Sequence, residues 1–487
     1  MGMRKLWVTL AALAAFAMAV FTGCDSPTGG GGGGGTILPI TFTVTFDSAG
    51  GSEVTAQSVV EGTPATRPDN VSRAFTPAPG LYAGTLDTQY TLAEWRHNDA
   101  AWDFTTPVTA NITLTAHWTA PTQTPIADVD PHDLAAVMVH VNATANSGAF
   151  TLAIGEEVVT RNHRLFNSNG VELTIVGVGG RRDIVFNADC DECSLFFVGH
   201  WEATTLESDS RLILGNNITL RGGQGANVYF SLILVSRTGH LIMEAGSEIT
   251  GHTNHGAVDV WSGHGAAVHI EANAAFTMRG GYIRGNRASG TGTNLAGGVF
   301  VQNATSVFTM TGGSISGNFR GTGSDEVPAD VFVSATVEDF TVSGNATIDR
   351  ITLDRIRLSN PTRDYHAFIT VGANWTGSIN RLDLLGTGSV QDTISWQWTG
   401  DSILQAAQGI TLTNAHVNNI NSKYVIGGTE DGARDFASLN REIGIRDNAG
   451  VVRMGWGYYC GCGYRWCWVD NYCDDDWCPS PDGCQCD

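Results

Sequence analysis

Acidic and basic side chains occur close together in one glycine-rich stretch of the chain, where their types could support cleavage of an acidic polysaccharide. The candidates are Asp325, Glu326, Asp330, Arg284, Arg287 and Arg320. Carboxylates can bind Ca²⁺ while a basic side chain neutralises a uronate and abstracts its α proton. These residue types permit a polysaccharide lyase, but their spacing does not single one out. A solvated charged loop is the favoured interpretation, and we assign no catalytic residue.

Histidines form a second cluster in the same stretch, at His240, His252, His255, His264 and His269. A pair three residues apart could bind a transition metal, because imidazole is a good ligand for several of these ions. Loops between β-strands do not form the helix that would place such a pair on one side. We therefore expect neither a metal ion nor a cofactor.

The ten cysteines indicate an oxidising compartment outside the cytosol. Cys190 and Cys193 have the spacing of redox and metal motifs, yet no second pair and no helical pattern accompany them. A local disulfide between them is therefore the favoured interpretation.

Residues 456–487 form a tail rich in cysteine, tryptophan and tyrosine. Its seven cysteines are Cys460, Cys462, Cys467, Cys473, Cys478, Cys484 and Cys486. A segment this short needs covalent cross-links to fold, so disulfides are expected. The odd number leaves one thiol for another chain, a ligand or no partner. Paired Cys-x-x-Cys motifs are absent, which disfavours a zinc site.

The first residues are typical of a targeting segment. Arg4 and Lys5 precede an uncharged run from Leu6 to Phe21, which is short for a membrane-spanning helix of about 20 residues and fits a signal peptide. Gly23-Cys24 resembles the lipobox of bacterial lipoproteins, although Phe21 stands where leucine is usual. The resemblance implies cleavage after residue 23 and lipidation of Cys24. Residues 24–37 contain seven consecutive glycines and are expected to form a flexible tether.

The overall charge argues against nucleic acid as a partner. The net charge is −21, whereas affinity for nucleic acid comes mainly from lysine and arginine. Only 15% of the residues are charged, and 60 of 487 are glycine. Glycine-rich turns and uncharged polar surface therefore dominate, which argues against an ordinary helical enzyme.

Residues 38–120 are expected to form a small β domain. It opens with Val44-Thr45-Phe46-Asp47 and Gly50-Gly51, and it closes with Ile112-Thr113-Leu114-Thr115-Ala116-His117-Trp118. This order of motifs resembles the Listeria–Bacteroides repeat, which implies a β-grasp-like spacer or adhesion module without catalytic residues. Residues 73–92 depart from the pattern. We expect Trp95, Trp102 and Trp118 to form a core rather than a sugar platform.

Two apolar patterns recur every 31 or 32 residues in the second part of the chain. Phe276-Thr277-Met278 returns as Phe308-Thr309-Met310, and Val268-His269-Ile270 returns as Val299-Phe300-Val301 and Val331-Phe332-Val333. Alternation within each copy directs one residue inward and the next outward. The expected inward columns are 268/299/331, 270/301/333, 276/308/340, 278/310/342 and 283/315/348.

Short strands stacked in this way predict an all-β fold, a right-handed parallel β-helix over residues 127–360 that follows the β-grasp-like domain. The Gly-Gly and Gly-Asn pairs supply tight corners. The repeats resemble pectate-lyase-like β-helices and bacterial polymorphic surface proteins, a likeness that indicates architecture rather than activity. Residues 361–455 lose the glycine period, so irregular β coils or a cap are expected there.

These patterns favour a lipid-anchored bacterial protein on the outer membrane or cell surface. It would be a non-enzymatic adhesion or binding scaffold for glycan, host matrix or neighbouring cells. The alternative is a polysaccharide lyase or hydrolase acting in a groove of the β-helix. The outward residues His269, Phe300 and Phe332 could form a contact stripe, because aligned aromatics on a sheet suit binding. Covering of the stripe by a loop is equally compatible with the sequence.

Overall fold

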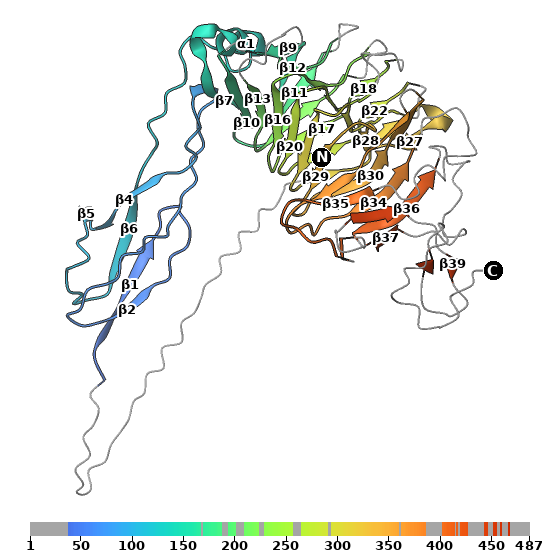
Figure 1. The fold of residues 1–487 in the computed structure, drawn as a ribbon. Helices are drawn as coiled ribbons and strands as arrows, with labels where there is room; N and C mark the ends of the chain where they lie inside the picture. Colours follow the sequence, from blue (N-terminus) through green and yellow to red (C-terminus); the bar gives the residue numbers. More distant parts are fainter. Residues whose placement is uncertain are drawn as a thin grey trace, which may run out of the picture. The chain divides into compact units, whose positions relative to one another are not determined.

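The computed structural model describes residues 38–166, 169–187, 193–200, 209–223, 228–256, 264–290, 294–359, 362–385, 402–413, 415–416, 419–426, 443–446, 451–454, 458–459 and 466–467. The signal segment, Cys24, the tether and most of the cysteine-rich tail lie outside these residues. The described chain forms two compact units (Figure 1). One contains residues 38–71 and 94–117, and the other contains residues 72–93 and the chain from 118 onward.

The first unit is a small β sheet. Its strands are β1 (Thr41–Asp47), β2 (Gln57–Val60), β4 (Thr91–His97), β5 (Ala100–Ala101) and β6 (Ile112–Thr119). They lie in the order β2-β1-β6-β4-β5, with β1 parallel to β6 and antiparallel to β2. Trp95 is buried and packs edge-on against Phe46, with 5.1 Å between the ring centroids. Trp95 is thus a core residue, as predicted, whereas Trp102 and Trp118 are half-buried.

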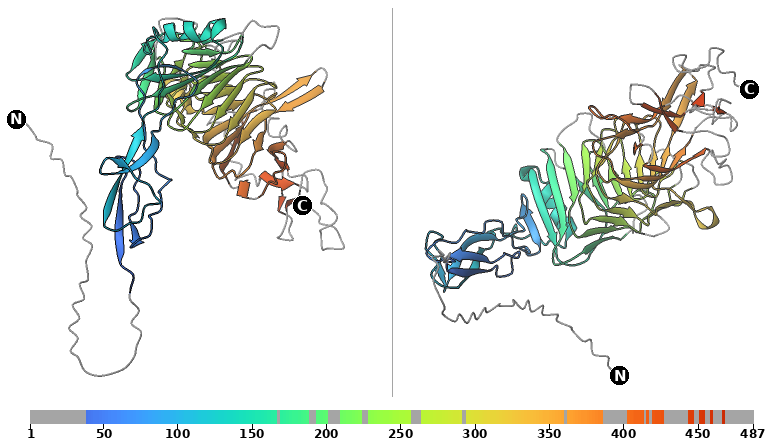
Figure 2. Two further views of the ribbon diagram at one scale, coloured as in Figure 1. Left: turned by 90° about the vertical axis from the view of Figure 1, so that its left-hand side faces the viewer. Right: turned by 90° about the horizontal axis from the view of Figure 1, so that it is seen from below.

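The second unit is an all-β coil of parallel strands, which confirms the predicted fold class. Figure 2 shows the strands stacked along the coil. One sheet contains, in spatial order, β3 (Gly80–Ala83), β7 (Gly148–Ile154), β10 (Val171–Gly177), β13 (Ser210–Leu214), β16 (Gly239–Met243), β20 (Ala275–Met278), β24 (Val307–Met310), β29 (Asp339–Val342), β33 (Ile369–Val371), β35 (Ser402–Ala406), β38 (Val451–Met454) and β37 (Ile443–Arg446).

A second sheet consists of two ladders joined at one long strand, β30 (Thr347–Leu353). The first ladder is β8 (Val158–Thr160), β11 (Arg182–Phe186), β14 (Ile218–Arg221), β17 (Glu248–Thr250), β21 (Tyr282–Arg284) and β25 (Ser314–Ile315). The other is β28 (Val331–Val333), β23 (Val299–Val301), β19 (Val268–Ile270), β15 (Ile233–Val235), β12 (Phe196–Val198) and β9 (His163–Leu165). Beyond β30 the stack continues through β34 (Ile379–Leu384) and β36 (Ile420–Ile426).

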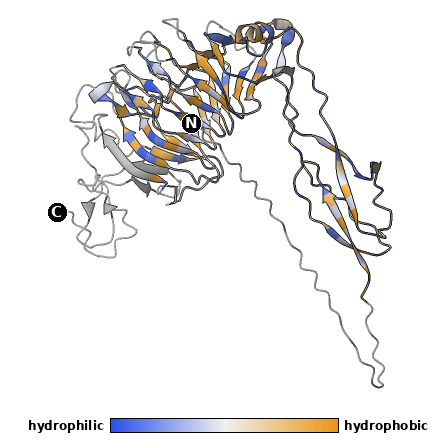
Figure 3. Cartoon of the chain, turned by 180° about the vertical axis from the view of Figure 1, so that it is seen from behind, coloured by the Kyte–Doolittle hydropathy of each residue, from blue (hydrophilic) through white to orange (hydrophobic). Residues whose placement is uncertain are grey.

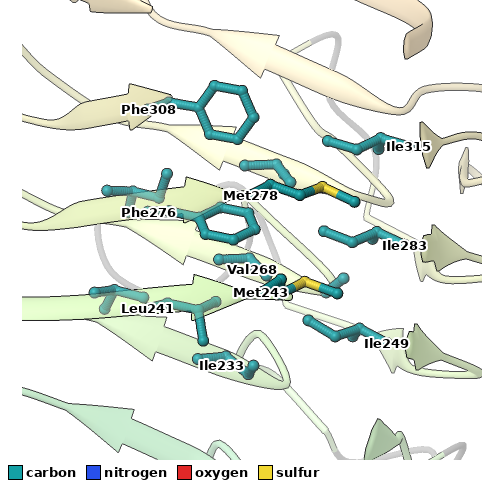
Figure 4. Packing of buried hydrophobic residues seen from close by; sticks show 14 of the residues in the cluster. Ile233, Leu241, Met243, Ile249, Val268, Phe276, Met278, Ile283, Phe308 and Ile315 are labelled. Atoms are coloured by element: carbon teal, nitrogen blue, oxygen red, sulfur yellow. The ribbon is translucent and has the colours of Figure 1, made fainter. Parts of the chain in front are cut away.

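Apolar side chains fill the interior of the coil in vertical columns. Figure 4 shows Leu241, Phe276 and Phe308 above one another, and Ile249, Ile283 and Ile315 in a second column. Many strands, such as β10, β20 and β24, alternate buried apolar residues with more exposed ones, a pattern that can be followed in Figure 3. All five predicted inward columns are buried, with at most 1% of any member exposed. The strand register pairs the members of each column that lie in regular strands, such as Phe276 with Phe308 and Phe308 with Phe340.

A ladder of polar side chains runs beside the apolar columns. The Asn318 carboxamide oxygen accepts from both the backbone N–H and the Nδ2 of Asn286, at 3.1 and 2.9 Å. Asp330 Oδ1 accepts from the same two groups of Asn318, at 2.9 and 2.8 Å. Buried polar groups need such partners because water cannot reach them. Asp330 therefore ends an internal asparagine ladder.

Lateral loops beside this ladder form a small sheet of their own. Its strands are β18 (Thr253–Asn254), β22 (Arg287–Ala288), β26 (Phe319–Arg320) and β27 (Val327–Pro328), and a short 3₁₀ helix η2 (Gly323–Asp325) precedes β27. The first three are parallel, and β27 closes the sheet antiparallel to β26. In the next coil the loop is absent, because β30 continues from one ladder into the other.

Further elements lie at both ends of the first sheet. At the start, β3 adds antiparallel to β7, and the apolar side of helix α1 (Leu134–Asn142) joins the main core through Leu134, Val137, Met138 and Val141. At the other end, β38 pairs antiparallel with β35 and β37 pairs with β38. Antiparallel closure and a covering helix block the open strand edges that would otherwise pair with other chains. The remaining elements are η1 (Thr144–Asn146), β31 (Arg355–Ser359), β32 (Thr362–His366), β39 (Tyr458–Tyr459) and β40 (Trp466–Cys467).

Candidate functional site

Two of the charged residues that the sequence offered for lyase chemistry pair with each other, and a third pairs with another acid. Arg287 forms a salt bridge with Glu326, and both side chains are about one-third exposed. Arg284 Nε lies 2.7 Å from Glu248 Oε1, a partner that the sequence reasoning did not name. Among the described residues, these groups form ion pairs that connect one coil to the next. They do not place an acid opposite a base across a cleft.

Asp330 and Arg320 lie in a polar cluster at the step where the lateral loops end. Asp330 is fully buried, so it is not part of a solvated charged loop, and this expectation from the sequence is corrected. The cluster includes Arg350 and Asp383, which form an ion pair with side chains 6% and 4% exposed. Arg381 Nε adds a second contact to Asp383, at 2.9 Å. Because Asp330, Arg350 and Asp383 are buried, this cluster serves the fold and is closed to a substrate.

The predicted contact stripe is also buried. His269, Phe300 and Phe332 occupy one register column on adjacent strands, and each is at most 4% exposed. The Phe300 and Phe332 rings are stacked, 5.3 Å apart, and both belong to a cluster with Leu385. The structure therefore favours the alternative in which other parts of the chain cover the stripe.

The clustered histidines take part in packing and hydrogen bonding. No group of three metal-ligating side chains occurs within the described ranges. His264 stacks on Phe300, and His255 Nδ1 lies 2.8 Å from the Ser289 hydroxyl. Burial lowers the pKa of His252 to about 4 and the pKa of His269 to about 3. Both rings are therefore neutral members of the packed structure.

Most of the predicted cysteine chemistry lies outside the described part of the chain. This applies to Cys24, Cys190, Cys460, Cys462, Cys473, Cys478, Cys484 and Cys486. Cys193 is buried at the start of the segment that leads into β12. Cys467 ends β40, which pairs with β39. The disulfides stay predictions.

The outer side of the first ladder carries three arginines and a tyrosine with exposed side chains, gathered around one largely buried acid, and they form the best candidate binding site. We define the arginine face as Arg181, Arg221, Glu248, Tyr282 and Arg284. The register places Glu248 beside Tyr282 and Thr250 beside Arg284, and their outward position follows from the buried Ile249 and Ile283 between them. Regular strand spacing thus fixes where each of these side chains leaves the sheet.

Glu248 is the organising group of this face. Its two carboxylate oxygens each accept from a different arginine, Oε2 from Arg181 Nη1 at 3.1 Å and Oε1 from Arg284 Nε at 2.7 Å. Arg181 Nη1 also donates to the Thr219 hydroxyl, at 2.9 Å. The carboxylate is 11% exposed, whereas the two arginines are 43% and 56% exposed. A largely buried anion therefore holds two guanidinium groups at the surface.

Tyr282 adds an aromatic surface beside these charges. It is 47% exposed, and the Arg284 guanidinium carbon lies 5.3 Å from the ring centroid. A cation over the face of an aromatic ring is attracted by the ring quadrupole. The hydrogen bond and the attraction of Glu248 raise the pKa of Arg284, so this guanidinium stays charged. Tyr282 was missed in the sequence, although its place between inward positions of a repeat marks it as an outward residue.

The fold and this face define an all-β protein built around a parallel β coil, with a polar, partly aromatic outer surface. Residues 42–75 match the family model of the Listeria-Bacteroides repeat domain. This match covers β1 and β2 of the first unit and agrees with the predicted resemblance. Neither the curated proteins nor the solved structures contain a match. Within the described residues, no helix has the length and apolar character needed to cross a membrane.

Proposed function

We propose that this protein is a lipid-anchored bacterial surface scaffold without enzymatic activity, and that it binds a glycan through the arginine face. The carrying observation is the half-exposed Tyr282 ring beside the oriented Arg284 guanidinium. A sugar can pack its C–H groups on an aromatic ring while its hydroxyls bond to neighbouring polar groups. Host matrix and neighbouring cells are the surfaces on which such a glycan would be displayed.

The pairing of the charged groups supports a scaffold over the alternative of a lyase or hydrolase. General acid–base catalysis needs a group within hydrogen-bond reach of the proton that it moves. Arg284 and Arg287 are instead engaged with Glu248 and Glu326, and Asp330 is buried. A stack of regular β turns whose surface charges are paired offers a stable surface for binding.

Replacing Tyr282 with alanine should abolish or strongly weaken glycan binding, because it removes the exposed ring. The Tyr282→Phe variant keeps the ring and should bind nearly as well as the unchanged protein. Binding of a soluble chain that starts at residue 25, and so lacks the lipid-bearing Cys24, would be measured on a glycan array and then quantified by calorimetry. Equal binding by Tyr282→Ala and the unchanged protein would exclude this face as the binding site. Unsaturated products released from an acidic polysaccharide with Ca²⁺ would instead establish the lyase.

The proposed anchor depends on Cys24, the residue that follows the lipobox-like sequence. Several acyl chains at about 0.8 kcal/mol for each buried methylene would hold the chain firmly on a membrane. The Cys24→Ser variant should therefore incorporate no labelled fatty acid and should move from the membrane fraction to the soluble fraction. Labelling that persists in this variant would contradict the assignment. The control is Thr309→Ala in the coil, a half-buried outward residue whose replacement should leave labelling unchanged.

A further inference from the structure

The geometry points to a sulfated glycan as the ligand of the arginine face, an inference that rests on the proposed function. The first reason is local charge. Arg181, Arg221 and Arg284 lie among three acids, Glu157, Asp183 and Glu248, so the charges of this surface balance. The chain as a whole carries −21. The face is therefore less acidic than the protein as a whole, and its exposed arginines can meet an anionic partner.

The second reason is the way in which the guanidinium groups are held. Among the described residues, Arg284 uses only Nε in hydrogen bonds and Arg181 uses only Nη1. Each guanidinium has five N–H donors, so most donors of both groups remain available to a ligand. Holding these side chains in place before binding reduces the conformational entropy that binding must overcome.

The third reason is the direction from which the arginines approach. Arg181 and Arg284 both bind Glu248 but come from different coils. Arg181 lies 67 residues before Glu248 in the sequence, and Arg284 lies 36 residues after it. A planar carboxylate matches one guanidinium fork well. A sulfate ester has three outer oxygens arranged around sulfur, so one group can accept from two converging guanidinium groups. Because Glu248 already accepts from both arginines, a ligand would meet their remaining N–H donors, and a sulfate ester offers these donors three outer oxygens where a uronic acid carboxylate offers two.

A fourth feature fits an extended chain rather than a single small anion. Arg221 and Arg284 occupy one outward column, with Thr250 between them. At about 4.8 Å for each strand, their backbone positions lie roughly 10 Å apart along the coil. Arg221 is 52% exposed and is held by Asp183, as Arg284 is held by Glu248. Two oriented arginines in line, with Tyr282 beside one of them, can contact successive sugars of one polymer.

The acidity of the rest of the protein does not prevent this contact. Interactions between exposed charges are largely screened beyond about 8 Å at physiological ionic strength. Contacts within the face are shorter than that distance. Binding should nevertheless weaken as salt is raised, because exposed arginines carry much of the attraction.

The test compares three glycans on the same soluble chain by calorimetry: heparin, fully desulfated heparin and neutral dextran. Heparin should bind, desulfated heparin should bind at least roughly tenfold more weakly, and Arg284→Ala should lower heparin affinity by about the same factor. Arg284→Lys keeps the charge but loses the fork, and it should recover only part of the affinity. The matched control is Arg279→Ala. Arg279 is 53% exposed and paired with Glu244 at 2.8 Å outside the arginine face, and its replacement should have no effect.

The possible results separate this inference from the proposed function. Equal affinity for heparin and desulfated heparin, or unchanged heparin binding in Arg284→Ala, would overturn the assignment of sulfate. A glycan that is bound without sulfate and lost in Tyr282→Ala would overturn only this inference and leave the proposed function in place. Absence of binding to every glycan on the array would overturn both. Circular dichroism of each variant establishes that the coil is intact.

Discussion

The Phe308→Ala variant should lose about 3–5 kcal/mol of unfolding free energy, the range for truncating a buried phenylalanine. Phe308 is fully buried and lies between Phe276 and Phe340, with ring centroids 5.4 and 4.8 Å away. Removing this ring would leave a cavity that touches three successive coils. Because neighbouring coils stabilise one another, the loss should spread through the stack. The change would be measured by chemical denaturation followed by circular dichroism.

The control for this experiment is Thr309→Ala on the same strand. Thr309 is the next residue, faces outward and is half-buried. Its replacement should change the unfolding free energy by no more than about 0.5 kcal/mol, as expected for a surface site. A loss below about 1 kcal/mol in Phe308→Ala would show that the column is not part of a packed interior.

The Asp330→Asn variant should remove a penalty that grows with pH. Burial raises the pKa of Asp330 to about 7, and the nearby Asp349 adds to the rise, whereas Arg350 and the two Asn318 donors oppose it. In the unfolded chain this carboxyl titrates near its ordinary value of about 3.9. The folded state thus binds a proton that the unfolded state has released, and Asp330 destabilises the fold progressively between about pH 4 and pH 7.

The measurable quantity is the difference in unfolding free energy between Asp330→Asn and the unchanged protein. It should be small near pH 4 and should favour the variant by a few kcal/mol near pH 8, on the order of 1.4 kcal/mol for each unit of pKa shift. The amide oxygen can still accept from Asn318, so the ladder persists. A difference that does not change with pH would contradict the buried, protonated carboxyl.

Other buried titratable groups also contribute to the pH dependence of the unfolding free energy, in both proteins. The pKa of Asp354 is raised to about 6 by burial, so it acts in the same direction as Asp330. His252 and His269 have lowered pKa values, and their contribution to stability is lost as the pH falls below about 6.5. Asp339→Asn is the control, because Asp339 is exposed. It should leave the pH dependence of the unchanged protein intact.

The interior of the coil could be predicted from the sequence because two signals agree there. Alternation assigns Phe276, Phe308 and Phe340 to the inner side, and the fixed period aligns them on successive coils. The burial of the outward stripe (His269, Phe300 and Phe332) could not be predicted in this way. Alternation places Phe300 and Phe332 outside the main core, but it cannot show that Leu385, more than 50 residues further along the chain, packs against them.

Asp330 and Tyr282 show why the polar sites were harder to predict. The ladder residues Asn286 and Asn318 are 32 residues apart. The next member, Asp330, follows Asn318 after only 12 residues because the chain folds back along β27. The 32-residue period therefore does not predict that Asp330 is an internal residue. The arginine face depends on ion pairs between residues of different coils, such as Arg181 and Glu248. These residues are far apart in the sequence, so no local motif predicts that they pair.

Strand β3 has a consequence for how this protein could have been assembled by gene rearrangement. Residues 72–93 lie within the repeat-like module in the sequence, yet they belong to the coil unit, where β3 covers the edge of β7. A simple end-to-end fusion of two genes near residue 120 would leave that edge bare. A recombinant that joins the coil to another leader should therefore keep residues 72–93, because the two units are interleaved in the sequence.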